Sequence, residues 1–377
     1  MTKRSILHVL LATTAIGCTI SIPVLAQTPP IPPASPPSQT APTPPTSIPT
    51  QLDTVTVAAT RNKLILDDVP GTVSVTTTED IDRENMQDIR DLTRNEPGVT
   101  VGNNPTRAGF QNFVIRGIGG NRVLIMVDGT RQPDFPDSNQ GAGNYARQQP
   151  DLEDIKRGEI IRGPASALYG SDAIGGVVAY TTKDPGDYLA PGKNIFGSVK
   201  GAYSGANQMF AETFTGAVRY GNVEFLGLYT RRDGHQYSVA QSYLSPNPQN
   251  WGENSFLGKL VFRPTEVDTI RITGAYQETN QSTQVLSGVG NFPTLFAKVF
   301  DTWGQDYTKQ YRISGQWLHE APVGFIDRMS LTGYFNSVNR QEDTYDLRGA
   351  AGGLIPTNAR TSNFQNNQNI WLSLIHI

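Results

Sequence analysis

The sequence has little of several features that would place it in a familiar class. Only one of its 377 residues is a cysteine, so the chain has no cysteine pair to form an internal disulfide. No stretch approaches the roughly eighteen consecutive apolar residues that a membrane helix needs, which excludes a helical membrane bundle. The net charge is −3 and the pI is near 5.9, and this balance argues against nucleic acid or another polyanion as the partner.

What the chain does have begins with an export signal. Lys3 and Arg4 precede an apolar stretch from Ile6 to Leu25 that ends in small residues. Residues 1–26 are therefore predicted to be a secretory signal peptide that is cleaved at its end. The stretch AIGC, which ends at Cys18, loosely resembles a lipoprotein site. The apolar stretch continues past it, however, and supplies a better cleavage site, which leaves a mature chain without cysteine.

A segment without a predicted core follows the signal peptide. Residues 27–50 consist mainly of Pro, Thr and Ser. Proline at this density favours extended polyproline II, at about 3.1 Å per residue or roughly 70 Å in all, which predicts a semi-rigid tether. Residues 51–60 come next, and the stretch LDTVTVAATRNK that begins at Leu52 reads as one short strand with nothing around it to pair with.

The composition changes to a mixed α/β pattern in residues 61–186. The stretch TTEDIDRENMQDIRDLTRNEPGV predicts two short helices, the second ended by Pro97 and Gly98. The stretches NFVIRGI, RVLIMVDG, RGEIIRG and AIGGVVAYTT predict short buried strands bounded by glycine. The glycines do not fit a nucleotide-binding fingerprint, since Arg122 stands where the last Gly is needed, and tight turns account for them better. We expect one compact domain here.

From residue 187 to residue 377 the apolar pattern has a period of two. In segments of about ten residues one face is apolar and the other is polar or charged, as a membrane β-barrel requires. A soluble β-sandwich would show the same alternation, but the export signal favours the barrel. The apolar face includes Phe214, Val218, Tyr220, Phe256, Leu260, Phe262, Ile270, Ile272 and Tyr276, and the polar face includes Thr213, Thr215, Arg219, Ser255, Lys259, Arg263, Thr269, Arg271 and Thr273.

The connections between these segments alternate in length. YGN, PTEV and APVGFID are short, whereas residues 231–254, 277–307 and 339–363 are long. Outer-membrane barrels have short periplasmic turns and long outer loops, so the alternation orients the sheet. About eight strands fit, yet a lumen that accepts a plug needs about 22. We therefore expect an incomplete barrel, and we expect the chain to be an N-terminal fragment of a larger protein.

Five successive motifs between Asp53 and Pro185 carry a resemblance to a known family. They are DTVTVAATR, VPGTVSVTTTEDI, IRDLTRNEPGVTVG, NFVIRGIGGNRVLIMVDGTRQPD and DLEDIKRGEIIRGPASALYGSDAIGGVVAYTTKDP. Together they resemble the signatures of TonB-dependent outer-membrane receptors, and their residues are most similar to those of the heme and hemoglobin receptor branch. The resemblance implies a transmembrane β-barrel, with about 8 of 22 strands present, and an N-terminal α+β plug formed by residues 61–186.

The resemblance also implies roles for individual residues. Asp53, Thr54, Val55, Thr56 and Val57 match the periplasmic segment that adds as a strand to the energy-coupling protein TonB, and main-chain pairing of this kind tolerates many side chains.

Two further positions, Arg116 and Arg162, resemble plug arginines that pair with carboxylates on the barrel wall. Such arginines need a partner when buried. Salt bridges within the plug remain an equally good alternative.

The search for chemistry in the sequence yields a tentative ligand site and no catalytic one. HEAPV at His319 lacks the second His of a zinc helix, and neither a Gly-x-Ser-x-Gly elbow nor a cysteine nucleophile is present. For heme, an axial His or Tyr facing outward is expected. His235 is the histidine expected in an outer loop, with Tyr237 and Tyr243 nearby and Tyr145 in a plug loop. A lone loop histidine is also commonly just solvated.

These observations lead to one functional hypothesis with alternatives. The chain is expected to belong to a Gram-negative outer-membrane receptor that imports an iron compound, with heme or hemoprotein-derived heme as cargo and with no required cofactor or bound metal. TonB and outer-membrane lipid are the other expected partners. A ferric siderophore or cobalamin is the alternative cargo, and a surface adhesin or signal transducer is a less favoured alternative.

Overall fold

The computed structural model describes residues 56–57, 64–65, 72–103, 107, 111–136, 145–238, 247–292, 297–322 and 328–376. The chain divides into two units, Met1–Gln51 and Leu52–Ile377, and every described residue belongs to the second. The predicted signal peptide and tether therefore lie outside the described residues. Strand β1 (Thr56–Val57) pairs antiparallel with β2 (Leu64–Ile65). The expectation that this strand has nothing nearby to pair with is wrong, because a second apolar pair shortly after it supplies the backbone groups.

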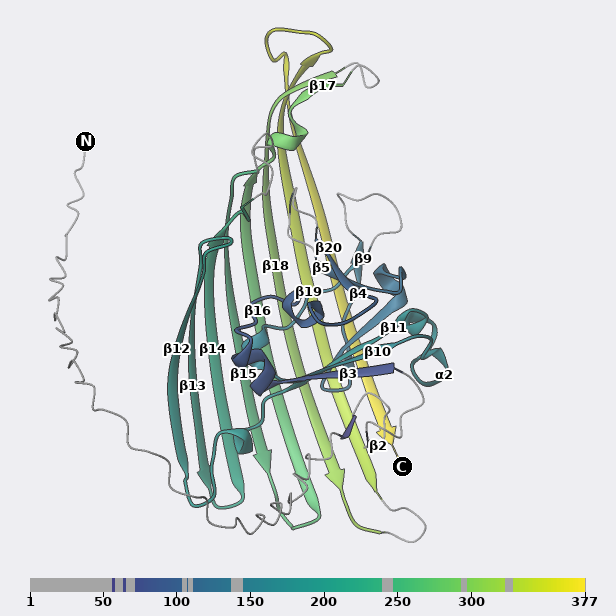
Figure 1. Cartoon of the computed structure of the whole chain (residues 1–377), viewed down its shortest axis with the longest axis vertical. Coiled ribbons are helices and arrows are strands. Elements are labelled where there is room, and N and C mark those ends of the chain that lie inside the picture. Colours follow the sequence, from purple (N-terminus) through teal and green to yellow (C-terminus); the bar gives the residue numbers. More distant parts are fainter. Residues whose placement is uncertain are drawn as a thin grey trace, which may run out of the picture. The chain divides into compact units, whose positions relative to one another are not determined.

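The described residues between 72 and 187, which we call the plug, form a small α+β domain. Its main sheet has the strand order β3-β10-β11-β6-β7, and β6 and β11 run parallel while the other neighbours are antiparallel (Figure 1). Two further hairpins, β4-β5 and β8-β9, lie outside this sheet. The strands are β3 (Thr72–Thr77), β4 (Val99–Asn103), β5 (Gln111–Ile115), β6 (Val123–Val127), β7 (Thr130–Arg131), β8 (Phe135–Pro136), β9 (Tyr145–Ala146), β10 (Ile155–Arg162) and β11 (Gly176–Thr182).

The plug helices are short and begin at local caps. Helix α1 (Thr78–Arg83) starts with a capping box, in which Thr77 and Asp80 satisfy each other's backbone N–H groups. The second predicted helix is reduced to the 3-10 turn η3 (Asp91–Thr93). The remaining helical pieces are η4 (Gly120–Arg122), η5 (Leu152–Asp154), α2 (Ser166–Tyr169), η6 (Ser171–Ala173) and η7 (Pro185–Asp187).

The plug core is apolar, and one glycine in it has no tolerable replacement. Ile115, Ile155 and Tyr180 are almost completely buried together with the predicted strands β6, β10 and β11. Gly176 has φ +150°, and a Cβ there would lie 2.8 Å from Ile115 Cδ1 and would also meet the Ile161 carbonyl oxygen. Close approach of neighbouring groups therefore explains this glycine, which is the first residue of β11 and not part of the tight turn that the sequence predicts.

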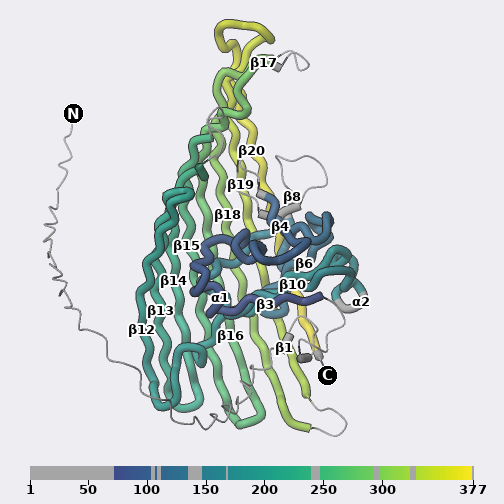
Figure 2. The backbone as a smooth tube through the Cα atoms, viewed as in Figure 1, coloured from purple at the N-terminus to yellow at the C-terminus, as the bar shows by residue number. Residues whose placement is uncertain are grey.

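The second half of the chain forms one large antiparallel sheet, which we call the wall. Its order is β12-β13-β14-β15-β16-β18-β19-β20, with the short β17 paired to β18 (Figures 1 and 2). The plug lies against one face of this sheet. The strands are β12 (Ile195–Ser204), β13 (Met209–Tyr220), β14 (Val223–His235), β15 (Gln249–Phe262), β16 (Asp268–Gln284), β17 (Gly290–Phe292), β18 (Ala297–His319), β19 (Met329–Ala350) and β20 (Asn358–His376), with the 3-10 turn η8 (Leu286–Gly288) before β17.

The wall buries its polar face and exposes its apolar face. Ser255 and Lys259, predicted to lie on the polar side, are 2% and 4% exposed. Phe214 and Ile272, predicted to lie on the apolar side, are 46% and 51% exposed. This inversion confirms the period-two prediction, because a soluble sandwich would bury the apolar face instead.

The short turns lie where the sequence predicts them, but the connections predicted to be long are much shorter than predicted. Gly221, with φ +55°, lies in a two-residue hairpin between β13 and β14. On the opposite edge the strands continue far into the stretches predicted to be loops, so only residues 236–248, 285–296 and 351–357 separate the long strands there. The prediction of very long loops is wrong, because strands that extend beyond an apolar layer keep their backbone pairing without an apolar face.

The interface between plug and wall as the candidate functional site

The two arginines predicted to lock the plug do not reach a described wall residue. Arg162 pairs with Glu96 at 3.1 Å and donates to the Pro97 carbonyl oxygen at 3.0 Å, both within the plug. Arg116 is exposed, has φ +50°, and forms no ion pair with any residue that the structure describes. The plug-internal alternative is therefore found for Arg162, and a role of either arginine in a wall lock stays a prediction.

A different charge pair joins the plug to the wall. Arg232, which points inward from β14, donates from Nε and Nη2 to the Asp151 carboxylate at 2.6 and 2.8 Å. Its Nη1 donates to Gln87 Oε1 at 3.2 Å, so one wall side chain holds two separate plug segments. Asp151 also accepts from the Glu153 backbone N–H at 2.8 Å and thereby caps η5. A buried pair with this forked geometry is strongly directional.

Electrostatics favour the charged form of Asp151. Burial by itself raises the pKa of this carboxyl, but the Arg232 guanidinium and the hydrogen bonds outweigh burial and hold the pKa below its ordinary value. Asp128, another plug carboxylate, follows the same pattern, since burial is outweighed by Lys259 and Arg312. Removing either partner of such a pair leaves the other charge buried and uncompensated.

Lysines on the wall make the same kind of contact. Lys259 on β15 donates to Asp184 at 2.9 Å and to the Thr182 carbonyl oxygen at 3.1 Å, where β11 ends. Lys200 on β12 bridges Asp82 and Glu153 at 2.7 and 2.8 Å. These contacts link the first wall strands to two carboxylate-bearing edges of the plug.

One contact has the opposite polarity. Arg107 of the plug pairs with Asp306 on β18 at 2.8 Å and donates to the Asp343 carbonyl oxygen at 2.6 Å. Gly304 makes room for it, because a Cβ there would lie 2.7 Å from Arg107 Cζ.

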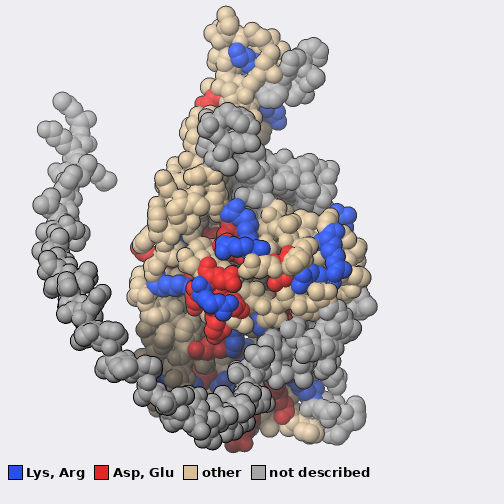
Figure 3. All heavy atoms as spheres, in the orientation of Figure 1, with Lys and Arg blue, Asp and Glu red and all other residues tan. Residues whose placement is uncertain are grey.

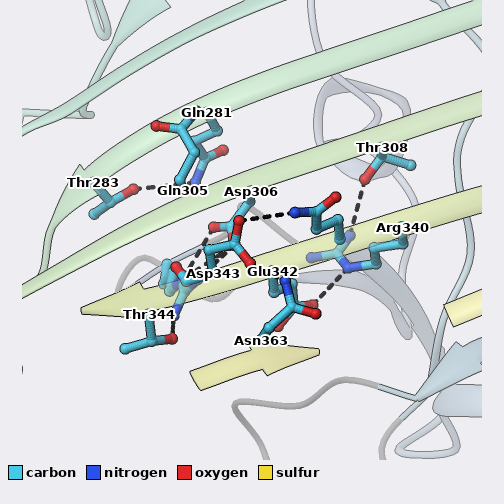
Figure 4. A network of polar contacts seen from close by, with 12 residues as sticks. Gln281, Thr283, Gln305, Asp306, Thr308, Arg340, Glu342, Asp343, Thr344 and Asn363 are labelled. Carbon is cyan, nitrogen blue, oxygen red and sulfur yellow. Dashed lines mark hydrogen bonds and ion pairs between the residues drawn. The ribbon is translucent and has the colours of Figure 1, made fainter. Parts of the chain in front are cut away.

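The wall residues around Asp306 form a polar network of their own. Figure 4 shows Asp306, Asp343 and Thr344 gathered near one another, and Arg340 reaching Thr308 and Glu342. Asp306 on β18 and Arg340 and Glu342 on β19 are buried and charged, so these two strands present charged side chains to the plug, whereas Asp343 contributes only its carbonyl oxygen to Arg107.

The interface as a whole therefore places wall cations against plug carboxylates more often than the reverse. The exposed side of the plug is charged as well, since Figure 3 shows blue and red atoms close together over the middle of the drawn surface, where the plug elements lie. Sequence reasoning placed Lys259 and Arg271 on the polar face but assigned none of the interface residues a partner in the plug, although one signal was available. Cations recur at inward positions of the wall strands, where contact with lipid is excluded, and each therefore needs an anionic partner inside. They include Lys200, Arg232, Lys259, Arg271 and Arg312.

His235, the histidine predicted to bind the ligand, lies apart from this interface. His235 is the last residue of β14 rather than part of a loop, and the alternation of the strand places it on the face away from the plug. Its Nδ1 lies 2.6 Å from Asn250 Oδ1. Tyr145 begins β9 on the plug, but its side chain and Tyr243 lie outside the described residues. Tyr237 donates to Asp88 at 3.1 Å and so contacts the plug. Their roles toward a ligand stay predictions.

Two searches of the described residues found nothing. No helix among them is long and apolar enough to cross a membrane. Within the same residues, no group of three or more His, Cys, Asp or Glu side chains is arranged to hold a metal ion. The described contacts of this interface, which we call the seat, are ion pairs and hydrogen bonds.

Comparison with known proteins identifies the plug and shows relatives of the longer chain. A family model described as the TonB-dependent receptor plug domain matches residues 66–177. Hemoglobin-binding protein A of Haemophilus influenzae is 30% identical over 282 residues, which cover 69% of this chain and 28% of that protein. Hemoglobin and hemoglobin-haptoglobin-binding protein B of the same species is 36% identical over 175 residues, which cover 44% of this chain and 16% of that protein. This chain thus spans less than a third of the length of these relatives.

Solved structures share the fold. The FrpB iron transporter from Neisseria meningitidis matches with a TM-score of 0.57 at 19% identity, over 73% of this chain and 45% of that chain. The unliganded ferric citrate transporter FecA matches with a TM-score of 0.52 at 14% identity, over 86% of this chain and 57% of that chain. The plug match, the fold of the wall and the similar proteins all point to one family. Residues 66–177 belong to the plug domain family of TonB-dependent receptors, and the chain is similar to TonB-dependent receptors, which are β-barrel proteins of the Gram-negative outer membrane.

Proposed function

We propose that the receptor imports an iron compound, with heme or heme taken from a hemoprotein as its cargo. The observation that carries the cargo assignment is the set of curated relatives at 30% to 36% identity, whose names describe hemoglobin binding. The fold supports transport, because a plug held against a barrel wall by ion pairs closes a passage that must open for cargo. Nothing in this arrangement requires a bond to be made or broken.

Coupling to TonB is assigned to Asp53–Val57. Strand addition by main-chain pairing would need this short strand to be released from its partner β2. In the intact receptor, deletion of Asp53–Ala58 is expected to abolish uptake while surface binding of heme or hemoglobin is retained. Uptake that persists in the deletion strain would contradict the assignment.

The cargo is tested separately from the coupling. An iron-starved host that carries the intact receptor as its one iron-uptake receptor is expected to grow on heme or hemoglobin as the sole iron source. Growth on a ferric siderophore, or cobalamin uptake, with no growth on heme would replace the cargo and leave the transport mechanism in place. Surface attachment without uptake of any of these compounds would favour an adhesin or a signal transducer.

His235 is the proposed contact for heme among the described residues. Its Nδ1 contacts Asn250, so Nε2 is the nitrogen that could meet a ligand approaching from outside. Substitution His235→Ala is expected to weaken heme binding, and Asn250→Ala is the matched control that frees the ring without removing it. Unchanged heme affinity and an unchanged heme absorption spectrum in His235→Ala would remove the residue from the site.

A further inference from the structure

A small cavity lies between the plug and the wall, where both contribute polar side chains. About 20 Å³ of it is open to the centre of a water molecule. From the plug it is lined by Gln132 and Asp154, and from the wall by Ser255, Gln277 and Arg312. A polar site of this size holds one water molecule when at least two polar groups face it. Two side chains in the lining, Gln132 and Asp154, each have a buried polar atom without a hydrogen-bond partner among the described residues.

Gln132 presents a buried donor. The residue is 2% exposed, and its backbone N–H is bonded to the Ile125 carbonyl oxygen at 3.0 Å. Its Oε1 accepts from Gln310 Nε2 at 2.7 Å and from Asn336 Nδ2 at 3.4 Å, so two wall strands fix the direction of the amide. Its Nε2 has no hydrogen-bond partner among the described residues.

Asp154 presents the complementary group. It is 5% exposed, and its Oδ2 accepts from Ser255 Oγ at 2.9 Å. Its Oδ1 has no hydrogen-bond partner in the described part of the chain. A buried carboxyl oxygen and a buried amide N–H that line one cavity call for a ligand that can both accept and donate hydrogen bonds.

The charges around Asp154 do not favour a second anion there. Asp151, three residues earlier, already uses the Arg232 guanidinium, and Glu153 uses Lys200. Burial first, and then the charge of Asp151, raise the pKa of Asp154 to about 7. The charged groups that act on the Asp154 carboxyl are Asp151, Lys183 after β11 and Arg312 on β18. Arg312 also lies 3.7 Å from Asp128. Arg232 on β14 and Glu253 on β15 interact instead with the neighbouring Asp151.

We propose that the cavity binds one water molecule between Asp154 Oδ1 and Gln132 Nε2, and that Asp154 holds a proton while the plug is seated, so that the seat loosens as pH rises. A protonated Asp154 and Gln132 both donate to the water oxygen, and the two water hydrogens remain for other oxygens of the lining. When the proton leaves, the water turns to donate to the carboxylate. The seat then carries an extra negative charge beside Asp151.

The direction of the pH effect follows from the two states of Asp154. When the plug is displaced and the carboxyl is in water, its pKa returns to the ordinary value of about 3.9. The seated plug is therefore favoured by protonation at low pH, and this advantage is lost as pH rises toward 7. Above that pH both states are ionised and the effect levels off.

The test uses the intact receptor in liposomes, with neither TonB nor cargo present. A fluorophore on the plug reports its release by urea at several pH values. The release equilibrium is expected to rise by up to about tenfold per pH unit between about pH 4 and pH 7 and to level off outside that range. The comparison is made in a Glu253→Gln background, because Glu253 is a second carboxyl that interacts with Asp151. In that background, Asp154→Asn is expected to abolish the pH dependence. Asp184→Asn, which breaks the neighbouring contact to Lys259, is the matched control and should weaken the seat without removing its pH dependence.

Two further measurements test the proposal even if Asp154→Asn does not fold. Ser255→Ala removes the hydrogen bond that favours ionised Asp154 and is expected to move the transition to higher pH. A crystal structure of the intact receptor should show a water within hydrogen-bonding distance of Asp154 Oδ1 and Gln132 Nε2. A pH-independent wild-type release, or an empty cavity in that crystal, overturns the proposal. Since the inference uses only the plug seat of the proposed transporter, its failure would leave the transport proposal standing.

Discussion

The plug and the wall both consist mainly of strands, yet they differ in where they place large apolar side chains. In the plug, Ile115 and Tyr180 are at most 1% exposed. In the wall, Thr230 and Asn336 are fully buried together with a few leucines such as Leu257, whereas Ile313 is 58% exposed. The backbone geometry is the same in both regions, so the surroundings decide which face is apolar. The plug has its own core, while the wall has lipid on one side and the plug on the other.

Charge separates the two regions in a second way. Some pairs within the plug, such as Arg83 with Asp80, lie at its surface, whereas Arg232 and Asp151 meet across the interface with side-chain exposures of 6% and 1%. A buried pair is weak evidence for net stability, but it is strongly orienting, since each partner is very unfavourable alone. We therefore expect the wall cations to determine the position of the plug more than they increase its stability.

The largest effect is expected from breaking this interface pair on one side. Asp151→Leu leaves Arg232 buried without its carboxylate and is expected to destabilise the seated plug by about 3–5 kcal/mol. The double variant Asp151→Leu with Arg232→Met removes both charges and should recover most of that loss. Urea-induced release of the plug in the intact receptor measures both values. If the single and double variants were equally unstable, the loss would come from packing and not from an unpaired charge.

A charge on the outer face of the wall tests the other side of the comparison. Ile313→Arg places a cation where lipid is expected, and it is expected to destabilise the folded wall by up to about 4 kcal/mol. Ile313→Val keeps the face apolar and serves as the control. Reversible folding of the intact receptor into liposomes, followed by urea titration, gives the difference. An Arg variant as stable as the control would show that this face is covered by water or protein instead of lipid.

Sequence reasoning captured the faces of the wall and missed its partners for a physical reason. A period of two assigns every residue of a strand to a face, so the burial of Ser255 and Lys259 was predictable from neighbours alone. The pairing of Arg232 with Asp151 joins residues 81 apart and depends on how the plug docks, which no local pattern encodes. Arg116 and Arg162 were predicted from motif resemblance to pair with the wall. Arg162 forms its ion pair with Glu96 inside the plug instead.

Strand length was hard to predict for a different reason. The outer part of β18, which has 23 residues, carries Asp301, Gln305 and Asp306 and reads as a polar loop. Beyond the apolar layer both faces of a strand can be polar, so the alternation disappears from the sequence while the backbone ladder continues. The position of His235 at a strand end instead of in a loop has the same cause.

Two glycines of one strand offer a smaller and cleaner test. Gly304→Ala would bring a methyl group against the Arg107 side chain, and the displaced contact with Asp306 is expected to cost about 1–3 kcal/mol. Gly315→Ala, on the same strand β18, meets no heavy atom within 4 Å and is expected to change stability little. Plug release by urea should separate the two variants. Equal values would mean that Arg107 can move aside without loss.

The smallest effect is expected for an ion pair that lies at the surface of the plug. Arg83 and Asp80 meet at 2.5 Å, but the Arg83 side chain is 66% exposed. Arg83→Ala is therefore expected to change the free energy of plug unfolding by less than about 1 kcal/mol, and by less still at high salt, because water screens the pair. Thr77→Ala, which removes the cap of the same helix, should cost more, about 0.5–2 kcal/mol. If Arg83→Ala destabilised the plug as much as Asp151→Leu, burial would not be what separates the two pairs, and the wall cations would lose their special role in positioning the plug.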